Sequence, residues 1–320
     1  MTDGVLAKIA EKLNGAKDVA VFCHVRPDGD ALGSGLALVI AMRNAGKKAC
    51  LFCEEAPPER LCIFPAMGTV ATQFPEGANF DVMVSVDCAD VTRMGVFAPS
   101  FRKFKGTTIN IDHHISNDKF AKLNFVRDCT ATCEIMPEVL SAAGFPLTRE
   151  IADLLAMGLL TDSGNFSHSD VSANTFAVAS ALRAAGADFA STGYAMFSRQ
   201  TKNRALLYAR VLSGMRFCLD DRLVFLTVMQ KDFAETGTEK SQTEGFVDFP
   251  LTIEGVEVSI ALMEVKKGQY KASLRSKRVS VNAVASEFGG GGHILASGCM
   301  LFGEYEEVIE RLTYAVYKQL

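Results

Sequence analysis

Short apolar runs alternate with longer segments of helical spacing through residues 1 to about 190. A short apolar run bounded by turn residues is typical of a buried strand, whereas apolar residues three or four positions apart are typical of a helix. This alternation predicts an α/β domain with a parallel sheet and helices on both faces. The predicted strands are 18–24, 48–53, 81–87 and 107–111, and the predicted helices are 31–45, 132–143, 148–160 and 172–185.

The pattern changes near residue 188, where the chain becomes turn-rich and then helical over 202–212. Beyond it, the apolar spacing predicts a smaller α+β domain with strands at 216–228, 256–265 and 269–276 and helices at 281–288 and 304–319. We therefore expect three parts, which are an α/β domain at 1–187, a helical linker at 188–215 and the α+β domain at 216–320.

Several apolar segments of the first domain end on an acid or an imidazole. Because the carboxyl ends of parallel strands lie at one edge of a sheet, we expect these side chains to converge there. The fourth segment of this kind is 156–162, which ends on Asp162. The converging residues are His24, Asp28, Asp30, Asp87, His113, His114 and Asp162.

The residue types in this set indicate a metal site. Carboxylate oxygens with one or two imidazoles suit Mn²⁺ or Mg²⁺ better than a thiolate-binding metal. Seven residues on one edge suggest two ions, which together can clamp a phosphoryl group and activate water for in-line displacement. We expect Asp87 to bridge the ions, with His24 and Asp28 completing one site and Asp30, His113 and Asp162 completing the other.

Two residues of the same stretch have other predicted roles. We expect Asp112 not to bind metal itself but to orient the His113 ring, as a carboxylate often does for a metal-binding imidazole. We expect His114 to face the substrate, where an imidazolium stabilises negative charge on the phosphoryl oxygens or the leaving group.

Composition and charge narrow the class of protein. The 320 residues carry a net charge of -4 with a pI near 5.8, which argues against a general binder of polyanions. The longest apolar run, 36–42, is too short to span a bilayer, and the N-terminus has no secretory leader pattern. Nine cysteines without regular spacing fit a reducing cytosol, so we expect a cytoplasmic protein.

The second domain contains two stretches suited to phosphate binding. The run 266–278 holds six cations and no acid, and Arg275 suits bidentate contact with a phosphate. The glycine run 289–292 lets backbone amides approach a ligand, and we expect the segment after it to open a helix whose N-terminus favours anions. The candidate substrate-binding residues are Arg275, Gly290, Gly291, Gly292 and His293.

These motifs resemble those of a known family. The stretch 24–34 (HVRPDGDALGS), Asp87, the triplet 112–114 (DHH) and 158–164 (GLLTDSG) resemble the successive motifs of the DHH phosphoesterase superfamily. The stretch 289–298 (GGGGHILASG) resembles the signature of the DHH-associated C-terminal domain. The chain length and the combination of these two sets of motifs are most similar to the bifunctional oligoribonuclease and 3′-phosphoadenosine-5′-phosphate (pAp) phosphatase branch. The resemblance implies a Mn²⁺-dependent enzyme with the ligand roles given above and its substrate between the domains.

Three residues are left without an assigned role. Glu134 stands in a stretch that is more often serine-rich in the family, and Pro137 follows it closely. His168 stands where a basic or aromatic residue is more usual, so it is either a substrate contact or a surface histidine. Arg93 is either functional or a residue on a helix face.

The sequence leaves three functions open. The first is hydrolysis of short oligoribonucleotides and pAp with two Mn²⁺ ions, or with Mg²⁺ or another divalent ion. The second is a phosphodiesterase for linear or cyclic dinucleotides, or a RecJ-like exonuclease. The third is a nucleotide-binding sensor without turnover. The expected partners are short RNA, pAp or dinucleotides, with no long double-stranded nucleic acid and no membrane, and a homodimer is left open.

Overall fold

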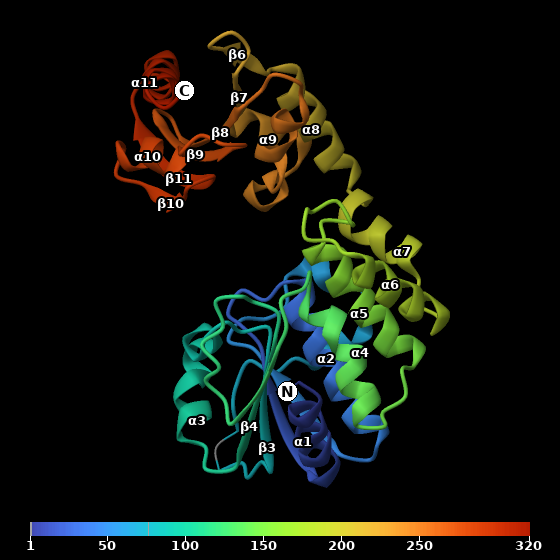
Figure 1. Ribbon diagram of the computed structural model, residues 1–320. Helices are drawn as coiled ribbons and strands as arrows, with labels where there is room; N and C mark the ends of the chain where they lie inside the picture. Colours follow the sequence, from blue (N-terminus) through green and yellow to red (C-terminus); the bar gives the residue numbers. More distant parts are fainter. Residues whose placement is uncertain (1, 76) are drawn as a thin grey trace. The chain divides into compact units, whose positions relative to one another are not determined.

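The computed structural model describes residues 2–75 and 77–320. The chain divides into two compact units, Met1–Arg199 (unit 1) and Gln200–Leu320 (unit 2), each with a buried apolar core (Figure 1). Within the described ranges, no helix is both long enough and apolar enough to cross a membrane.

Unit 1 is built on a five-stranded sheet in the order β2-β1-β3-β4-β5, and every neighbouring pair is parallel. The predicted fold class is therefore confirmed. The last strand was not predicted, because it has four residues and only one of them is buried. The strands are β1 (Asp18–Phe22), β2 (Lys48–Phe52), β3 (Val82–Val86), β4 (Thr107–Asp112) and β5 (Leu123–Val126).

Helices cover both faces of this sheet because its strands are apolar on both sides. Val19 and Val21 of β1 pack with buried residues of the large helices, whereas Ala20 and Phe22 pack with the phenylalanines of η3 and α3 (Figure 1). The helices of unit 1 are α1 (Thr2–Gly15), α2 (Gly29–Asn44), α3 (Ala98–Lys103), α4 (Thr132–Ala142), α5 (Arg149–Asp162), α6 (Ala173–Ala184) and α7 (Phe189–Gly193), with the shorter turns η1 (Glu59–Leu61), η2 (Pro65–Thr69), η3 (Val91–Phe97) and η4 (Tyr194–Ser198).

The segment that ends on Asp162 differs from one prediction. Residues 156–162 form the last turns of α5 and not a strand, so the idea of a fourth strand end was wrong and the overlapping helix prediction was confirmed. The segment is apolar because both sides of this stretch of α5 are buried against the neighbouring helices. A short apolar run does not distinguish a buried strand from a buried helix.

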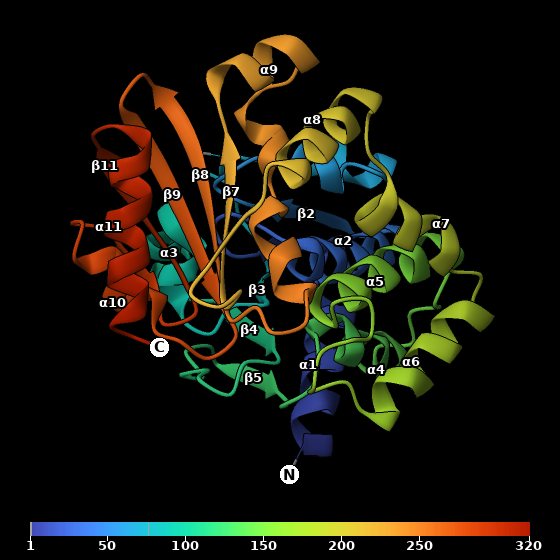
Figure 2. The ribbon, with the colours of Figure 1, turned by 90° about the horizontal axis from the view of Figure 1, so that it is seen from above.

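Unit 2 contains a six-stranded mixed sheet in the order β10-β11-β9-β8-β7-β6. Helices α10 and α11 pack on one face, and α8, α9 and η6 pack on the other (Figure 2). Its elements are α8 (Lys202–Ser213), β6 (Arg216–Cys218), β7 (Leu223–Val228), α9 (Gln230–Thr236), η5 (Lys240–Thr243), η6 (Phe246–Thr252), β8 (Val258–Lys266), β9 (Gln269–Ser276), α10 (Val281–Ser286), β10 (Gly291–His293), β11 (Ala296–Phe302) and α11 (Tyr305–Tyr317).

Two predictions for unit 2 were wrong. The single strand expected at 216–228 is a hairpin, because Leu219, Asp220 and Asp221 all have positive φ and turn the chain back. The glycine run does not open a helix, since it leads into the hairpin of β10 and β11. A Cβ atom on Gly290 would lie 2.2 Å from the carbonyl oxygen of Gly298, so the glycine allows this close approach between backbones.

Candidate metal centre

Asp87 lies at the centre of the predicted site. It follows β3 with a φ of 56°, a left-handed conformation that Asp adopts more readily than most residues, and its side chain is 2 % exposed. One carboxylate oxygen, Oδ2, lies 3.4 Å from Nε2 of His24, and the other, Oδ1, lies 3.5 Å from Nε2 of His113. The two oxygens therefore face two different histidines.

The first group of candidate ligands is formed by His24, Asp28 and Asp87. His24 follows β1, and its Nε2 atom lies 3.5 Å from Oδ2 of Asp28. Asp28 is the N-cap of α2, where its Oδ1 atom accepts hydrogen bonds from the amides of Asp30 and Ala31. The cap fixes the carboxylate and leaves Oδ2 directed at the group.

The second group is formed by Asp30, His113 and Asp162. Nε2 of His113 lies 3.5 Å from Oδ2 of Asp162, which ends α5. Both oxygens of Asp30 accept hydrogen bonds from backbone amides, 2.6 Å from Thr132 and 2.8 Å from Cys133. These amides belong to the N-terminus of α4, so the helix holds the buried carboxylate in place.

The imidazole rings are oriented for metal binding. Nδ1 of His24 lies 2.9 Å from the carbonyl oxygen of Val25, and Nδ1 of His113 lies 2.9 Å from that of Cys129. A carbonyl can only accept, so each Nδ1 carries a proton, and Nε2 is the ring atom that faces the carboxylates and is left to bind a metal. Ions held at about 2.1 Å place neighbouring ligand atoms roughly 3.0–3.5 Å apart, which fits the separations in both groups.

The charges in the site also favour cations. Burial, together with the nearby carboxylates of Asp30 and Asp87, raises the pKa of Asp162 to about 10. Burial and Asp87 likewise raise the pKa of Asp30 to about 7. Burial of the His24 ring lowers its pKa, but the carboxylates of Asp28 and Asp87 outweigh this effect and raise the pKa to about 11. The raised pKa values reflect crowded carboxylates that resist ionisation together, and bound divalent cations would favour their ionised forms.

His114 lies beside these groups and is partnered by Asp112. Its Nδ1 atom lies 2.8 Å from Oδ1 of Asp112, and the ring is 38 % exposed. The prediction that Asp112 orients His113 was wrong, because alternate residues at the end of a strand share a side of the sheet. Asn117, which sequence reasoning missed, donates to Oδ2 of Asp112 at 2.5 Å and to the Cys88 carbonyl at 3.0 Å.

Several other residues near the site have contacts that the sequence did not indicate. The hydroxyl of Thr132 donates to Oδ1 of Asp87 at 3.1 Å. Glu134 is buried away from the ligands and accepts from Asn174 at 2.6 Å and Thr175 at 2.9 Å, so it joins α4 to α6. Nδ1 of His168 lies 2.7 Å from the carbonyl oxygen of Asp162, which holds this exposed ring next to a candidate ligand.

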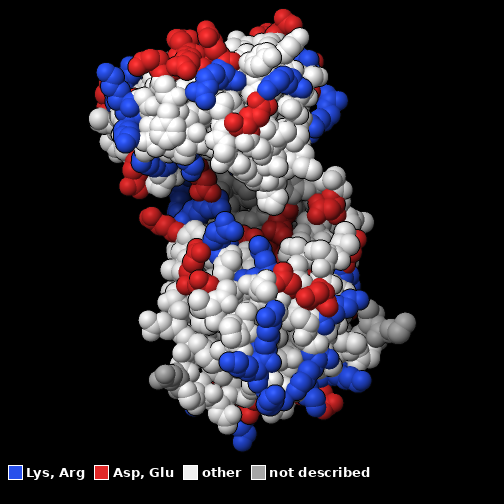
Figure 3. Space-filling view, turned by 90° about the vertical axis from the view of Figure 1, so that its left-hand side faces the viewer, with Lys and Arg blue, Asp and Glu red and all other residues white. Residues whose placement is uncertain are grey.

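The candidate substrate residues of unit 2 lie close together around β9 and the β10–β11 hairpin. Arg275 pairs with Ala296 in the sheet, and its Nε atom lies 3.4 Å from Oδ1 of Asp248. Gly291, Gly292 and His293 form β10 and are exposed. Acidic and basic side chains are interspersed on the visible face of unit 2 (Figure 3).

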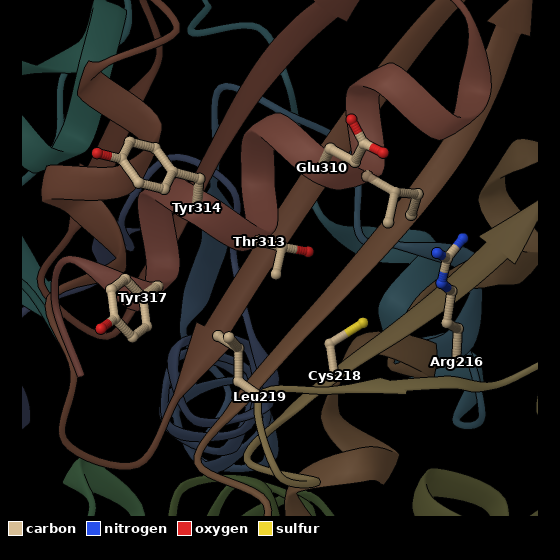
Figure 4. Close-up of a pocket in the computed structure, with 8 residues that line it drawn as sticks. Arg216, Cys218, Leu219, Glu310, Thr313, Tyr314 and Tyr317 are labelled. Carbon is tan, nitrogen blue, oxygen red and sulfur yellow. The ribbon is translucent and has the colours of Figure 1, made fainter.

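A separate pocket of unit 2 holds none of the predicted site residues. Its volume is about 310 Å³ and it lies between β6 and α11 (Figure 4). Arg216, one of its polar lining residues, is already paired with Glu306 at 2.6 Å. The remaining lining residues are Cys218, Leu219, Ile309, Glu310, Thr313, Tyr314 and Tyr317.

Comparison with known proteins agrees with this arrangement. Residues 18–159 match the DHH family, N-terminal domain, and residues 220–320 match the DHHA1 domain. The chain is 32% identical to the bifunctional oligoribonuclease and PAP phosphatase NrnA of Thermus thermophilus, over 99% of this chain and 94% of that protein.

Two solved structures are also similar. One is an exopolyphosphatase-related protein from Bacteroides fragilis, with a TM-score of 0.83 and 26% identity, over 99% of this chain and 96% of that one. The other is RecJ in complex with Mn²⁺ from Thermus thermophilus, with a TM-score of 0.52 and 16% identity, over 98% of this chain and 55% of that one. The second likeness is one of fold alone.

Proposed function

Because the chain belongs to the DHH family and carries a DHHA1 domain, we propose that it hydrolyses short oligoribonucleotides to mononucleotides and pAp to AMP and phosphate. Members of this family act on phosphoester bonds, so the chain is a hydrolase of that class. The Thermus thermophilus relative, which matches over nearly the whole of both chains, supports the choice of substrates.

The observation that carries the proposal is that Asp87 faces both sets of candidate ligands, with Oδ2 3.4 Å from Nε2 of His24 and Oδ1 3.5 Å from Nε2 of His113. In our proposal, His24 and Asp28 hold one ion and His113, Asp30 and Asp162 hold the other. Two Mn²⁺ ions there, or Mg²⁺ in their place, would supply an activated water and charge neutralisation for the phosphoryl group. The protein's part is to fix the ligands, through the α2 cap, the α4 amides and the two backbone carbonyls.

The remaining candidate residues would act on the substrate. His114, held by Asp112, would donate a proton or a hydrogen bond through Nε2 to an oxygen of the phosphoryl group or to the leaving group. Arg275, His293 and the amides of Gly290, Gly291 and Gly292 would hold a terminal nucleotide. In this proposal, residues 1–187 catalyse the hydrolysis and residues 216–320 select the substrate.

A product time course with Mn²⁺ tests the proposal directly. The substrates are pAp, a linear dinucleotide, a cyclic dinucleotide and a 20-nucleotide strand. We expect rapid release of AMP from pAp and of mononucleotides from the linear dinucleotide, with slower attack on the long strand. Exclusive hydrolysis of the cyclic dinucleotide, or faster cleavage of the long strand, would favour the signalling phosphodiesterase or the RecJ-like exonuclease instead.

A further inference from the structure

Arg26 lies in the loop between two candidate metal ligands and is held in an unusual conformation. Its φ is 54°, which is rare for a residue with a long side chain, and the proline that follows it is buried. The side chain is exposed, and no acid of the described chain forms an ion pair with it. A strained backbone at a functional loop is maintained only where the surrounding structure enforces it.

Arg93 lies on the neighbouring segment of the same sheet edge. Its carbonyl oxygen accepts a 2.8 Å hydrogen bond from the amide of Val25, the residue before Arg26. Gly95 permits this contact, since a Cβ atom there would lie 2.5 Å from Cγ1 of Val25. The loop after β1 and the turn after β3, which carry the two exposed arginines, are therefore packed together.

Two acids on the segments that surround these arginines accept hydrogen bonds from backbone amides. Oδ1 of Asp90 accepts from the amide of Thr92 at 2.7 Å, and Oε2 of Glu54 accepts from the amide of Val96 at 2.8 Å. Elsewhere in unit 1, arginine does find an acid, as in the 2.6 Å pair of Arg127 and Glu138. No acid of the described chain forms a close ion pair with Arg26 or Arg93, although the pKa of Asp90 is lowered by hydrogen bonds from Thr92 and, to a lesser extent, by the charge of Arg93.

An exposed arginine beside a cluster of carboxylates is favourable where an anionic ligand completes the set of charges.

We propose that Arg26 and Arg93 form a phosphate-binding pair for the phosphate of the substrate that is not cleaved. In pAp this is the second phosphate of the same nucleotide, and in a dinucleotide it is the neighbouring phosphate of the chain. This inference rests on the proposed function, because it assumes a substrate with two phosphates. It gives the first unit its own means of selecting such substrates.

Equilibrium binding separates this inference from the hydrolytic activity. Titration calorimetry with Ca²⁺ in place of Mn²⁺ compares pAp, which has two phosphates, with adenosine 3′-phosphate, which has only the phosphate that is cleaved. We expect Arg26→Ala and Arg93→Ala each to weaken pAp binding roughly 10- to 100-fold, the range for lost hydrogen bonds to a charged group, and to change the binding of adenosine 3′-phosphate little. The matched control is Arg102→Ala, which removes an exposed arginine at the end of α3.

A second variant separates the effect of losing the guanidinium group from the effect of the strained backbone. Arg26→Gly relieves the strain of the positive φ while it removes the charge, so it should lose pAp affinity as Arg26→Ala does. The inference is overturned if both arginine variants bind pAp like the control, if adenosine 3′-phosphate and pAp weaken equally, or if the unaltered protein binds pAp no more tightly than adenosine 3′-phosphate. Tight pAp binding without any hydrolysis would contradict the proposed function and leave the arginine pair standing.

Discussion

Nδ1 of His114 donates a 2.8 Å hydrogen bond to Oδ1 of Asp112, two residues earlier in the chain. Asp112 is fully buried at the end of β4, whereas the His114 ring is partly exposed. The buried carboxylate therefore orients the ring and supports its positive charge, while Nε2 stays available to a substrate.

If Asp112 acts through His114, the two residues behave as one unit. We expect Asp112→Asn to lower kcat by roughly 10- to 100-fold with little change in KM, in line with the contribution of a positioned proton donor. His114→Ala should cost at least as much, and the double variant should cost no more than His114→Ala alone. Additive losses in this double-mutant cycle of kcat values would contradict a shared role.

Removal of metal tests the ligand groups. Dialysis against a chelator should abolish hydrolysis of pAp, because the site then lacks the groups that activate water and neutralise the phosphoryl charge. Added Mn²⁺ should restore the rate better than Ca²⁺, whose larger and more flexible shell activates water less. Full activity in a metal-stripped sample would refute the mechanism.

Asp87 faces His24 with one carboxylate oxygen and His113 with the other, so its loss should affect both proposed ions. We expect Asp87→Ala to lower kcat by at least about 10²- to 10³-fold and His168→Ala to have a much smaller effect. Metal analysis gives an independent measure, since Asp87→Ala should lose Mn²⁺ from both sites and Asp28→Ala from one. Equal Mn²⁺ content in the unaltered protein and Asp87→Ala would exclude the bridging assignment.

Arg275 tests the role of the second unit. Arg275→Ala should raise KM for a dinucleotide by an amount equivalent to about 1–3 kcal/mol, the cost of a charged hydrogen bond. Hydrolysis of a small chromogenic phosphodiester should change little, because that substrate has no terminal nucleotide to hold. Arg278→Ala is the control, since Arg278 is 79 % exposed and lies 3.9 Å from its acid. Equal slowing of both substrates by Arg275→Ala would argue against this role.

Asp81 gives a pH-dependent prediction about the fold. Its Oδ2 atom accepts from the amides of Lys17 at 2.7 Å and Asp18 at 3.0 Å, and these hydrogen bonds lower its pKa. A lowered carboxyl pKa stabilises the fold above the ordinary pKa, and the contribution is lost as pH falls through the folded value.

Asp81→Asn should therefore reduce the free energy of unfolding at about pH 7, and the difference from the unaltered protein should shrink toward about pH 3. Urea unfolding at the two pH values measures this. The control is Asp128→Asn, since Asp128 is exposed and its carboxylate accepts no hydrogen bond from the residues described. A deficit for Asp81→Asn that stays constant with pH would contradict the linkage.

Much of the fold follows from local patterns in the sequence. The apolar strands that precede His24, Asp87 and His113 could be read from the chain, because a buried strand needs a short apolar run whatever it pairs with. The same local signal failed at 156–162 and 216–228, since a buried helix and a tight hairpin produce similar apolar runs.

The sequence by itself determined which chemical groups the site contains, because the ends of parallel strands meet at one edge. Only the tertiary structure decided how those groups are held. Asp30 accepts from amides more than 100 residues away at the N-terminus of α4, and Arg93 supports the loop of Arg26 through one carbonyl. Such contacts form only where the fold brings a helix end next to a loop. The spacing of residues along the chain does not reveal which helix end and which loop will meet.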